Sequence, residues 1–326
     1  MRIFFLIPVL SVMIQVSHVT KFFDSGATAV KDVSFEVKEG ETLVLLGTSG
    51  GGKTTTLRMI NRLIEPDEGS ISIDGKDIRQ LQPTYLRRKI GYVLQNTGLF
   101  PHYTVLENIG VVPQLLKWEK TAIEKRSRSL MEKLRLSAAE YAHVYPHQLS
   151  GGQQQRVGLA RALAADPPIL LMDEPFGALD PLTRINVRQE FRKLDELHNK
   201  IVILVTHDVE EAFELGTRIG LMNQGSMQQL GTPKDLLFRP ANAFVQQFLQ
   251  PKQFELELKT LLVEDIINWL PDTTNGSPDL TLEPGNSCWE ALAAGINESV
   301  VQYNGQQKLV NGNTILEAIA RYKKAL

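Results

Sequence analysis

Residues 47–54 read GTSGGGKT and are the first segment whose residue types could do chemistry. They fit the pattern G-x-x-x-x-G-K-[ST], in which glycines let backbone N–H groups converge on phosphate oxygens. Lys53 is expected to reach the β- and γ-phosphates of a nucleotide, and Thr54 to offer its hydroxyl to Mg²⁺. A flexible glycine turn, the alternative interpretation, explains neither the lysine nor the threonine. The residues expected to bind the nucleotide here are Gly47, Ser49, Gly50, Gly52, Lys53, Thr54 and Thr55.

Two adjacent carboxylates, Asp173 and Glu174, follow an apolar run over residues 169–172. A carboxylate at the carboxyl end of a buried strand, beside a phosphate loop, is placed to hold Mg²⁺. We therefore predict that Asp173 takes part in metal binding and that Glu174 polarises the attacking water as a general base. Alone, the pair could instead cap a helix that begins near Pro175. The phosphate loop in the same chain favours the catalytic interpretation.

A second candidate anion site is formed by Ser150, Gly151, Gly152 and Gln153, which precede an expected helix over residues 154–165. A hydroxyl, glycine amides and a helix N-terminus are together suited to a phosphate. Because one chain then carries two phosphate-binding elements, we expect this second element to contact the γ-phosphate bound by another protomer.

Among the six histidines, His207 has a distinctive position. It follows the apolar run over residues 201–205, where its ring can contact the γ-phosphate and position water. Surface or core roles are the better interpretation for the other five, His18, His102, His143, His147 and His198.

Continuous apolar runs are the elements that must position these residues. The runs at residues 42–46, 169–172 and 201–205 are typical of strands buried on both faces, and each ends in polar residues. Residues 30–40 alternate between apolar and polar, which predicts a half-buried antiparallel strand. Helical periods dominate over residues 103–150 and indicate an inserted helical subdomain. The predicted fold class is therefore α/β, with a parallel P-loop NTPase core of the RecA-like kind and an antiparallel β-subdomain.

Composition narrows the class of protein. The chain has 326 residues, 43% hydrophobic and 22% charged, which excludes disordered and collagen-like classes. Its 35 Lys and Arg nearly balance 37 Asp and Glu, so nothing overall attracts a nucleic acid, and phosphate binding must be local. Cys288 is the single cysteine, which excludes an intrachain disulfide framework and is typical of a reducing compartment.

Residues 1–12 read MRIFFLIPVLSV and superficially resemble a secretory signal. The apolar run is too short to span a bilayer, and no Ala-x-Ala cleavage site follows. We therefore interpret the segment as an N-terminal extension or a start-site artefact, with translation beginning at Met13. A processed signal is the alternative.

These motifs and their order, with Gln95 between the phosphate loop and the second glycine motif, resemble the ATP-binding subunit of an ABC transporter. The resemblance covers about residues 14–250 and implies that two copies stack head to tail around two ATP molecules with Mg²⁺. Each ATP would lie between the phosphate loop of one copy and the Ser150 segment of the other. By the same resemblance Phe23 stacks on adenine, Gln95 contacts Mg²⁺ and the attacking water, and Asp180 belongs to the nucleotide site.

A narrower resemblance, to importers of quaternary ammonium osmoprotectants such as glycine betaine, choline and carnitine, is carried by residues 61–66, 90–102 and 112–118. It implies three partners: a second ATP-binding subunit, identical or related, transmembrane permease subunits and an extracytoplasmic solute-binding protein. The chain would be a peripheral protein on the cytoplasmic face of the inner membrane. Import of another solute such as an amino acid, a soluble ABC ATPase acting on DNA or ribosomes, and a nucleotide-binding regulator without turnover are the alternatives. Because the chain lacks zinc cysteines and long coiled-coil insertions, no nucleic-acid partner is expected.

Residues 255–326 differ from the rest, since acidic residues outnumber basic ones. An expected helix at 287–294, a strand at 300–301, a turn at Asn304-Gly305 and a helix at 314–322 resemble one degenerate CBS repeat, a β-α-β-β-α module linked to regulation. A small α+β domain is therefore predicted. The alternative is a stabilising tail that binds no ligand.

Overall fold

The computed structural model describes residues 13–23, 28–273, 281–294, 299–303 and 306–325. The apolar segment 1–12 and the expected turn at residues 304–305 lie outside this part of the chain. The protein divides into two compact units, Met1–Gln228 and Gln229–Leu326. Within the described ranges, no helix combines the length and the hydrophobicity that a membrane crossing needs.

The first unit is built around a six-stranded sheet in the order β10-β9-β3-β8-β7-β6. β3 pairs in parallel with β8 and β9, and β7 pairs in parallel with β6 and β8. Every residue of β7 and β8 is buried, which is why these segments read as continuous apolar runs. The predicted parallel core is therefore confirmed. The strands are β3 (Thr42–Gly47), β6 (Ile90–Val93), β7 (Ile169–Asp173), β8 (Ile201–Thr206), β9 (Arg218–Asn223) and β10 (Ser226–Gly231).

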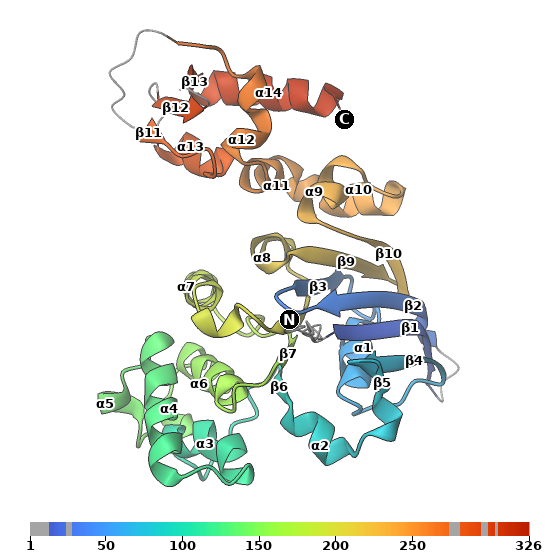
Figure 1. The fold of residues 1–326 in the computed structure, drawn as a ribbon, viewed down its shortest axis with the longest axis vertical. Helices are drawn as coiled ribbons and strands as arrows, with labels where there is room; N and C mark the ends of the chain where they lie inside the picture. The colour runs from blue at the N-terminus through green and yellow to red at the C-terminus, as the bar shows by residue number, and fades with distance from the viewer. Residues whose placement is uncertain (1–12, 24–27, 274–280, 295–298, 304–305, 326) are drawn as a thin grey trace, which may run out of the picture. The chain divides into compact units, whose positions relative to one another are not determined.

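The other sheet of this unit is antiparallel and has the order β2-β1-β4-β5. In β2 the buried residues Val33, Phe35 and Val37 alternate with more exposed ones, as the sequence pattern predicts. α1 (Lys53–Ile60) contacts β2 as well as the parallel strands β3, β7 and β8, so it packs against both sheets (Figure 1). The strands are β1 (Met13–Phe22), β2 (Thr28–Lys38), β4 (Glu68–Ile73) and β5 (Lys76–Asp77).

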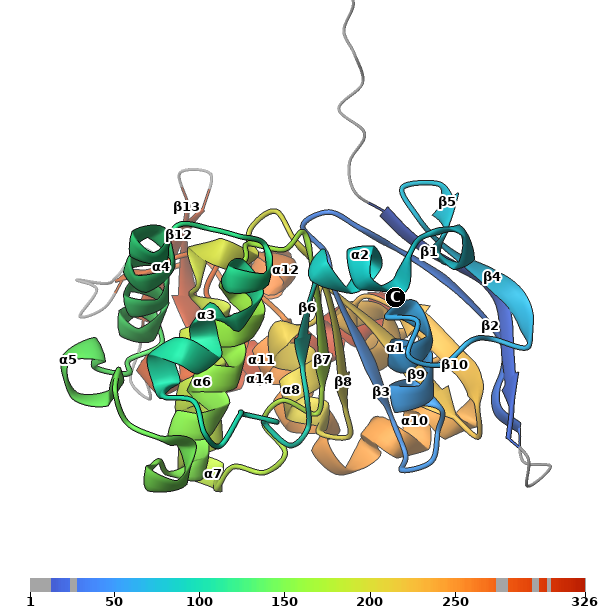
Figure 2. The same cartoon turned by 90° about the horizontal axis from the view of Figure 1, so that it is seen from below.

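Helices replace strands between β6 and β7, as predicted for residues 103–150. Figure 1 and Figure 2 both place them on one side of β6, β7 and β8, with α1 on the other side. The predicted helix over 154–165 was wrong at both ends: α6 begins at Gly151 and ends at Leu163. It starts early because Ser150 caps it, and it ends early because Pro167 follows closely. The helices are α3 (Val105–Leu115), α4 (Lys120–Lys133), α5 (Ala138–Tyr141), η2 (Pro146–Gln148) and α6 (Gly151–Leu163).

Two further helices follow β7 and β8 and begin near the carboxyl edge of the parallel sheet, where α/β folds bind ligands. Asp180 caps α7 by accepting a hydrogen bond from the backbone N–H of Thr183. Asp208 caps α8 by accepting from the N–H groups of Glu210 and Glu211. Both helices are thus anchored where the candidate catalytic residues lie. The remaining helices of this unit are η1 (Ile78–Gln80), α2 (Pro83–Arg88), α7 (Pro181–Arg192), η3 (Asp195–Leu197) and α8 (Val209–Leu215).

The second unit begins with helices and contains a three-stranded sheet of order β11-β12-β13, which the helix α14 follows. β11 runs parallel to β12, which pairs antiparallel with β13. The elements β11-α13-β12-β13-α14 follow the expected β-α-β-β-α order, and the likeness to a CBS repeat stays a prediction. The elements are α9 (Pro233–Phe238), α10 (Ala243–Leu249), η4 (Gln250–Lys252), α11 (Gln253–Thr260), α12 (Val263–Ile266), η5 (Ile267–Trp269), β11 (Thr281–Leu282), α13 (Cys288–Ala294), β12 (Ser299–Tyr303), β13 (Gln306–Val310) and α14 (Gly312–Ala325).

This second unit has a hydrophobic core of its own, which includes the fully buried Cys288 and Ile315. The ring of Tyr322 contacts Phe238 and Trp269 edge-on, with centroids 5.4 Å and 5.7 Å apart. Because Phe238 of α9 belongs to this core, the compact unit begins well before the change in composition at residue 255.

Candidate functional site

The phosphate loop connects the end of β3 to the start of α1, and its glycines are required by close backbone contacts. A Cβ atom on Gly47 would lie 2.0 Å from the carbonyl oxygen of Met222. Gly52, the residue before α1, has a φ of 93°, and a Cβ there would lie 2.4 Å from the carbonyl oxygen of Ala29. A side chain at either position is therefore excluded. The exposed loop and the N-terminus of α1 together form the arrangement that binds phosphate groups.

Lys53 lies against this loop and is only 5% exposed. Its ammonium donates hydrogen bonds to the carbonyl oxygens of Gly47, at 3.0 Å, and Thr48, at 2.8 Å. Burial lowers the pKa of Lys53, although the carboxylates of Glu174 and Asp173 oppose that shift. The ammonium is thus held at the position where a phosphate would replace the loop carbonyls as its partner.

Thr54 and Asp173 form the candidate metal site. The Thr54 hydroxyl donates to Oδ1 of Asp173 at 2.7 Å, which joins the start of α1 to the end of β7. Burial raises the pKa of Asp173, and the hydrogen bond from Thr54 opposes that rise. A hydroxyl and a carboxylate beside a phosphate loop are the protein oxygens with which Mg²⁺ is bound in nucleotide sites, where it keeps several waters. The residues present fit this ion.

The structure brings together the three predicted catalytic residues, Gln95, Glu174 and His207. Nε2 of Gln95 donates to Oε2 of Glu174 at 3.1 Å, and Nδ1 of His207 lies 3.3 Å from Oε1 of the same carboxylate. They come from the segments that follow β6, β7 and β8, so the carboxyl edge of the parallel sheet positions them. The two contacts orient the carboxylate of Glu174 from two sides, an arrangement suited to a carboxylate that acts on a water molecule.

Glu174 has a backbone conformation that is unusual for a residue with a side chain, with a φ of 44°. Its N–H donates to the carbonyl oxygen of Val205 at 2.9 Å, and its own carbonyl oxygen accepts from the N–H of Gly177 at 3.2 Å. These bonds hold the turn that aims the carboxylate. A left-handed residue of this kind typically costs about 1 kcal/mol or more and concentrates at functional sites.

The Ser150 segment lies at the start of α6. The hydroxyl of Ser150 accepts a hydrogen bond from the N–H of Gln153 at 3.3 Å, and Oε1 of Gln153 accepts from the N–H of Ser150 at 2.8 Å. Gly152 is buried, and a Cβ there would lie 2.5 Å from Cγ2 of Thr183. Because α6 and α1 lie on opposite sides of β6, β7 and β8, one chain does not bring this segment together with its own phosphate loop (Figure 2).

The other predicted binding residues lie in the phosphate loop, on α1, after β1 and at the start of α7. Ser49 and Gly50 are exposed in the loop, Thr55 is half-buried on α1, and Phe23 follows β1 with 44% of its surface exposed. Asp180 caps α7, and the hydrogen bond from Thr183 lowers the pKa of its carboxyl.

One residue near the site was not predicted from the sequence. Arg184 contacts Asp208, the residue that follows His207, with 3.4 Å between its Nη1 and Oδ2 of Asp208. A signal for it was present, because Arg184 lies one helical turn after Asp180, and helical side chains point back toward the N-terminus.

Comparisons with known proteins agree with this geometry. The family model described as ABC transporter matches residues 30–177. The glycine betaine/carnitine/choline transport ATP-binding protein OpuCA of Bacillus subtilis is 47% identical over 270 residues, which cover 82% of this chain and 71% of that protein. The glycine betaine uptake system ATP-binding protein YehX of Escherichia coli is 51% identical over 249 residues, covering 76% and 80%.

A solved structure shares the fold. It is the dimeric, post-hydrolysis state of the ATP-binding cassette MJ0796 bound to ADP and Pi, with a TM-score of 0.61 and 37% sequence identity. The match covers 67% of this chain and 98% of that chain. Because these relatives match most of its length and it carries the phosphate loop and the adjacent carboxylates, the chain belongs to the family of ABC transporter ATP-binding proteins.

Proposed function

We propose that this chain is the ATP-hydrolysing subunit of an importer for glycine betaine or a related quaternary ammonium osmoprotectant. The convergence of Gln95 and His207 on the carboxylate of Glu174, next to Thr54 and Asp173, is the observation that carries the hydrolytic part. The substrate class is supported by the names of the relatives in Bacillus subtilis and Escherichia coli.

In the proposed reaction, water attacks the γ-phosphorus of ATP in line with the leaving β-phosphate oxygen. The loop N–H groups and Lys53 hold the phosphates, and Glu174 orients the water and accepts its proton. Gln95 and His207 fix the carboxylate of Glu174 through the contacts at 3.1 Å and 3.3 Å. Thr54 and Asp173 would hold Mg²⁺, which supplies positive charge against the developing charge on the phosphates.

We propose that two copies, identical or related, complete each site. The support is that the Ser150 segment and the phosphate loop of one chain lie on opposite sides of β6, β7 and β8 (Figure 1). A partner's Ser150, Gly151, Gly152 and Gln153 would then contact the γ-phosphate, with Asp180 near the same interface and Phe23 against adenine. The similar solved structure of MJ0796, which is bound to ADP and Pi, is a dimer.

The importer partners follow from the same proposal. The chain would bind transmembrane permease subunits at the cytoplasmic face of the inner membrane, and a solute-binding protein would deliver the solute from the other side. We further propose an ATP-binding domain over residues 13–250, which includes the first helices of the second compact unit, and a CBS-like domain over residues 255–326 that adjusts activity. Deletion of residues 255–326 should change the ionic-strength dependence of ATP hydrolysis in the assembled transporter, and an unchanged dependence would reject the regulatory role.

Glu174→Gln tests the hydrolytic function. The amide keeps the size of the side chain but cannot accept a proton from water, so turnover should fall by about 100-fold or more. ATP binding and an ATP-dependent dimer, measured by calorimetry and gel filtration, should persist because the phosphate loop is unchanged. Glu140→Gln is the matched control, since Glu140 is an exposed carboxylate on α5. Normal turnover in Glu174→Gln would contradict the proposal, and absence of turnover in the wild-type transporter would favour a nucleotide-binding regulator.

A further inference from the structure

Arg184 connects two backbone segments that carry predicted catalytic residues. Its Nη2 donates to the carbonyl oxygens of Leu179, at 3.0 Å, and Gly177, at 3.5 Å. Its Nη1 donates to Oδ2 of Asp208 at 3.4 Å. One guanidinium therefore spans the loop that follows Glu174 and the residue that follows His207. This use of several donors in a fixed plane is specific to arginine.

Both ends of this bridge lie next to the contact between His207 and Glu174. The N–H of Gly177 donates to the carbonyl oxygen of Glu174, and the carbonyl oxygen of Gly177 accepts from Arg184. Arg184 therefore stabilises the turn that sets the direction of the Glu174 carboxylate. Asp208 accepts from the N–H groups of Glu210, at 2.9 Å, and Glu211, at 3.2 Å, which fixes it at the start of α8. A shift of either end would change the 3.3 Å separation of Nδ1 of His207 and Oε1 of Glu174.

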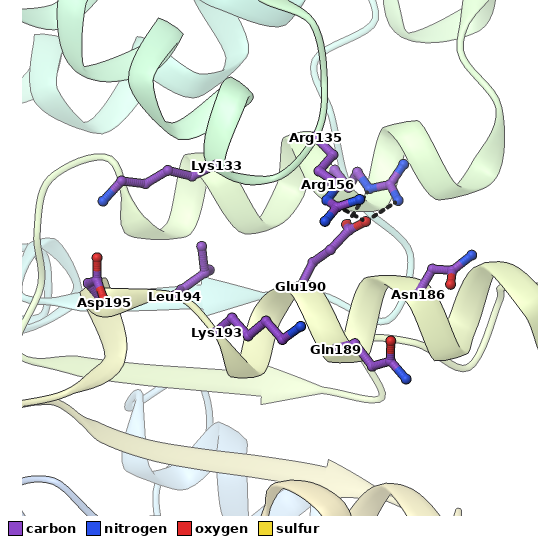
Figure 3. A pocket seen from close by; sticks show the side chains of 9 residues that line it. All are labelled: Lys133, Arg135, Arg156, Asn186, Gln189, Glu190, Lys193, Leu194 and Asp195. Carbon is purple, nitrogen blue, oxygen red and sulfur yellow. Dashed lines mark hydrogen bonds and ion pairs between the residues drawn. The ribbon is translucent and has the colours of Figure 1, made fainter. Parts of the chain in front are cut away.

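The helix that carries Arg184 is also fastened to α6, the helix of the Ser150 segment. Nε of Arg156 donates to Oε2 of Glu190 at 3.0 Å, and its Nη2 donates to Oε1 at 3.2 Å. Figure 3 shows Arg135 and Arg156 converging on Glu190, and Nε of Arg135 lies 3.8 Å from Oε1 of Glu190. At the other end of α7, Thr183 packs against Gly152. α7 therefore contacts α6 at two places, through Glu190 and through Thr183.

We propose that Arg184 is a positioning residue for hydrolysis, which keeps the turn at Glu174 and the segment of His207 in fixed positions relative to each other. Because Arg184 lies on α7, and α7 contacts α6, a movement of α6 would also move these two segments. This role requires no contact between Arg184 and the nucleotide. The inference rests on the proposed function, because it requires Glu174 to act on water.

The neighbouring arginine on α7 has a different setting. Nη2 of Arg188 lies 2.8 Å from Oε2 of Glu214, and its Nη1 lies 4.0 Å from Oδ2 of Asp208. Its side chain is only 6% exposed, whereas that of Arg184 is 28% exposed. Arg188 therefore mainly joins α7 to α8 in the interior, and Arg184 alone of the two contacts the loop after Glu174.

The test compares Arg184→Gln and Arg184→Lys with the control Arg192→Gln, which removes an exposed arginine near the end of the same helix. In the full chain, Arg184→Gln should lower kcat for ATP hydrolysis by about 10- to 100-fold, the effect expected of a misplaced catalytic group. KM for ATP and ATP affinity should stay within about twofold, since the phosphate loop is not touched. Arg184→Lys should be intermediate, because a lysine keeps the charge but cannot span the three acceptors.

A double-mutant cycle separates positioning from general destabilisation. Asp208→Asn combined with Arg184→Gln should lower kcat about as much as the more damaging single change, because both break one bridge. The inference would be overturned if kcat is unchanged in Arg184→Gln, or if kcat and ATP affinity fall equally. It would also be overturned if the fold-losses in kcat of the two single variants multiply in the double variant. Glu174→Gln is measured in parallel: normal turnover there removes the proposed function, whereas its loss with normal turnover in Arg184→Gln removes only the role of Arg184.

Discussion

Glu211 on α8 allows a quantitative test of the side-chain packing between α8 and the end of β8, because its burial makes the stability of the protein depend on pH. Its side chain is 2% exposed, and Oε2 accepts a hydrogen bond from the hydroxyl of Thr206 at 3.1 Å. Oε1 has no hydrogen-bond partner among the residues that the structure describes. Burial, and to a lesser extent the charge of Asp208, raise the pKa of Glu211 to about 8, although Thr206, Arg188 and Arg184 oppose the shift. The folded protein therefore holds a proton on Glu211 at neutral pH.

The size of the effect follows from the difference between the folded and unfolded states. A glutamate in the unfolded chain has a pKa of 4.5, so between pH 4.5 and about pH 8 the folded state binds one more proton there. The free energy of unfolding consequently falls by about 1.4 kcal/mol for each pH unit in this window, and by about 5 kcal/mol across it. Glu211→Gln removes this slope, so the variant should gain stability over the wild type as the pH rises.

Hydrogen exchange of β8, followed by mass spectrometry, measures this difference in the interior of the first unit. The ratio of protection in Glu211→Gln to that in the wild type should rise about tenfold per pH unit from pH 5.5 to 7.5 and become constant above pH 9. Glu210→Gln, the adjacent and less buried position, is the control and should show no such rise. A ratio for Glu211→Gln that does not change with pH would refute the reasoning.

Three further predictions follow from individual contacts. Lys53→Met removes the ammonium that is proposed to bind the phosphates, so MgATP affinity in calorimetry should fall by about 10- to 100-fold, and unchanged affinity would contradict the assigned role. Gly152→Ala forces a methyl group against Thr183 and should lower stability in thermal unfolding by about 1–3 kcal/mol, whereas Gly151→Ala, which meets nothing within 4 Å, should not. Cys288 is buried, and burial raises the pKa of its thiol to about 12, so it should resist a disulfide reagent until the second unit unfolds; rapid labelling of the folded protein would argue against that core.

The parallel core could be predicted because its strands are buried on both faces and leave unbroken apolar runs. Residues 169–172 and 201–205 became β7 and β8 for that reason. The start of α6 could not be placed correctly, since Gly151 and Gly152 are weak helix formers and the pattern favoured a loop there. The capping box between Ser150 and Gln153, together with packing against α7, outweighs that local preference.

The proximity of Glu174 and His207 was predictable because polar residues after parallel strands meet at one edge of a sheet, whereas the role of Gln95 came from the family resemblance. The link between Arg184 and Asp208 was not, because the spacing places Arg184 one helical turn after Asp180 but no local pattern joins it to Asp208, which lies in a separate element. The burial of Glu211 was also hidden, since a glutamate in a helix is normally on the surface. Such contacts depend on tertiary packing, which the local sequence pattern does not encode.

In the proposed function, ATP hydrolysis at Glu174 drives import of a quaternary ammonium solute. The direct test is ATP-dependent uptake of labelled glycine betaine by vesicles that hold this chain with its permease and solute-binding protein, in the wild type and in Glu174→Gln. We expect uptake in the wild type and its loss in Glu174→Gln. Uptake that survives in Glu174→Gln would contradict the catalytic role, and ATP hydrolysis by the wild-type complex without uptake of glycine betaine, choline or carnitine would contradict the substrate class.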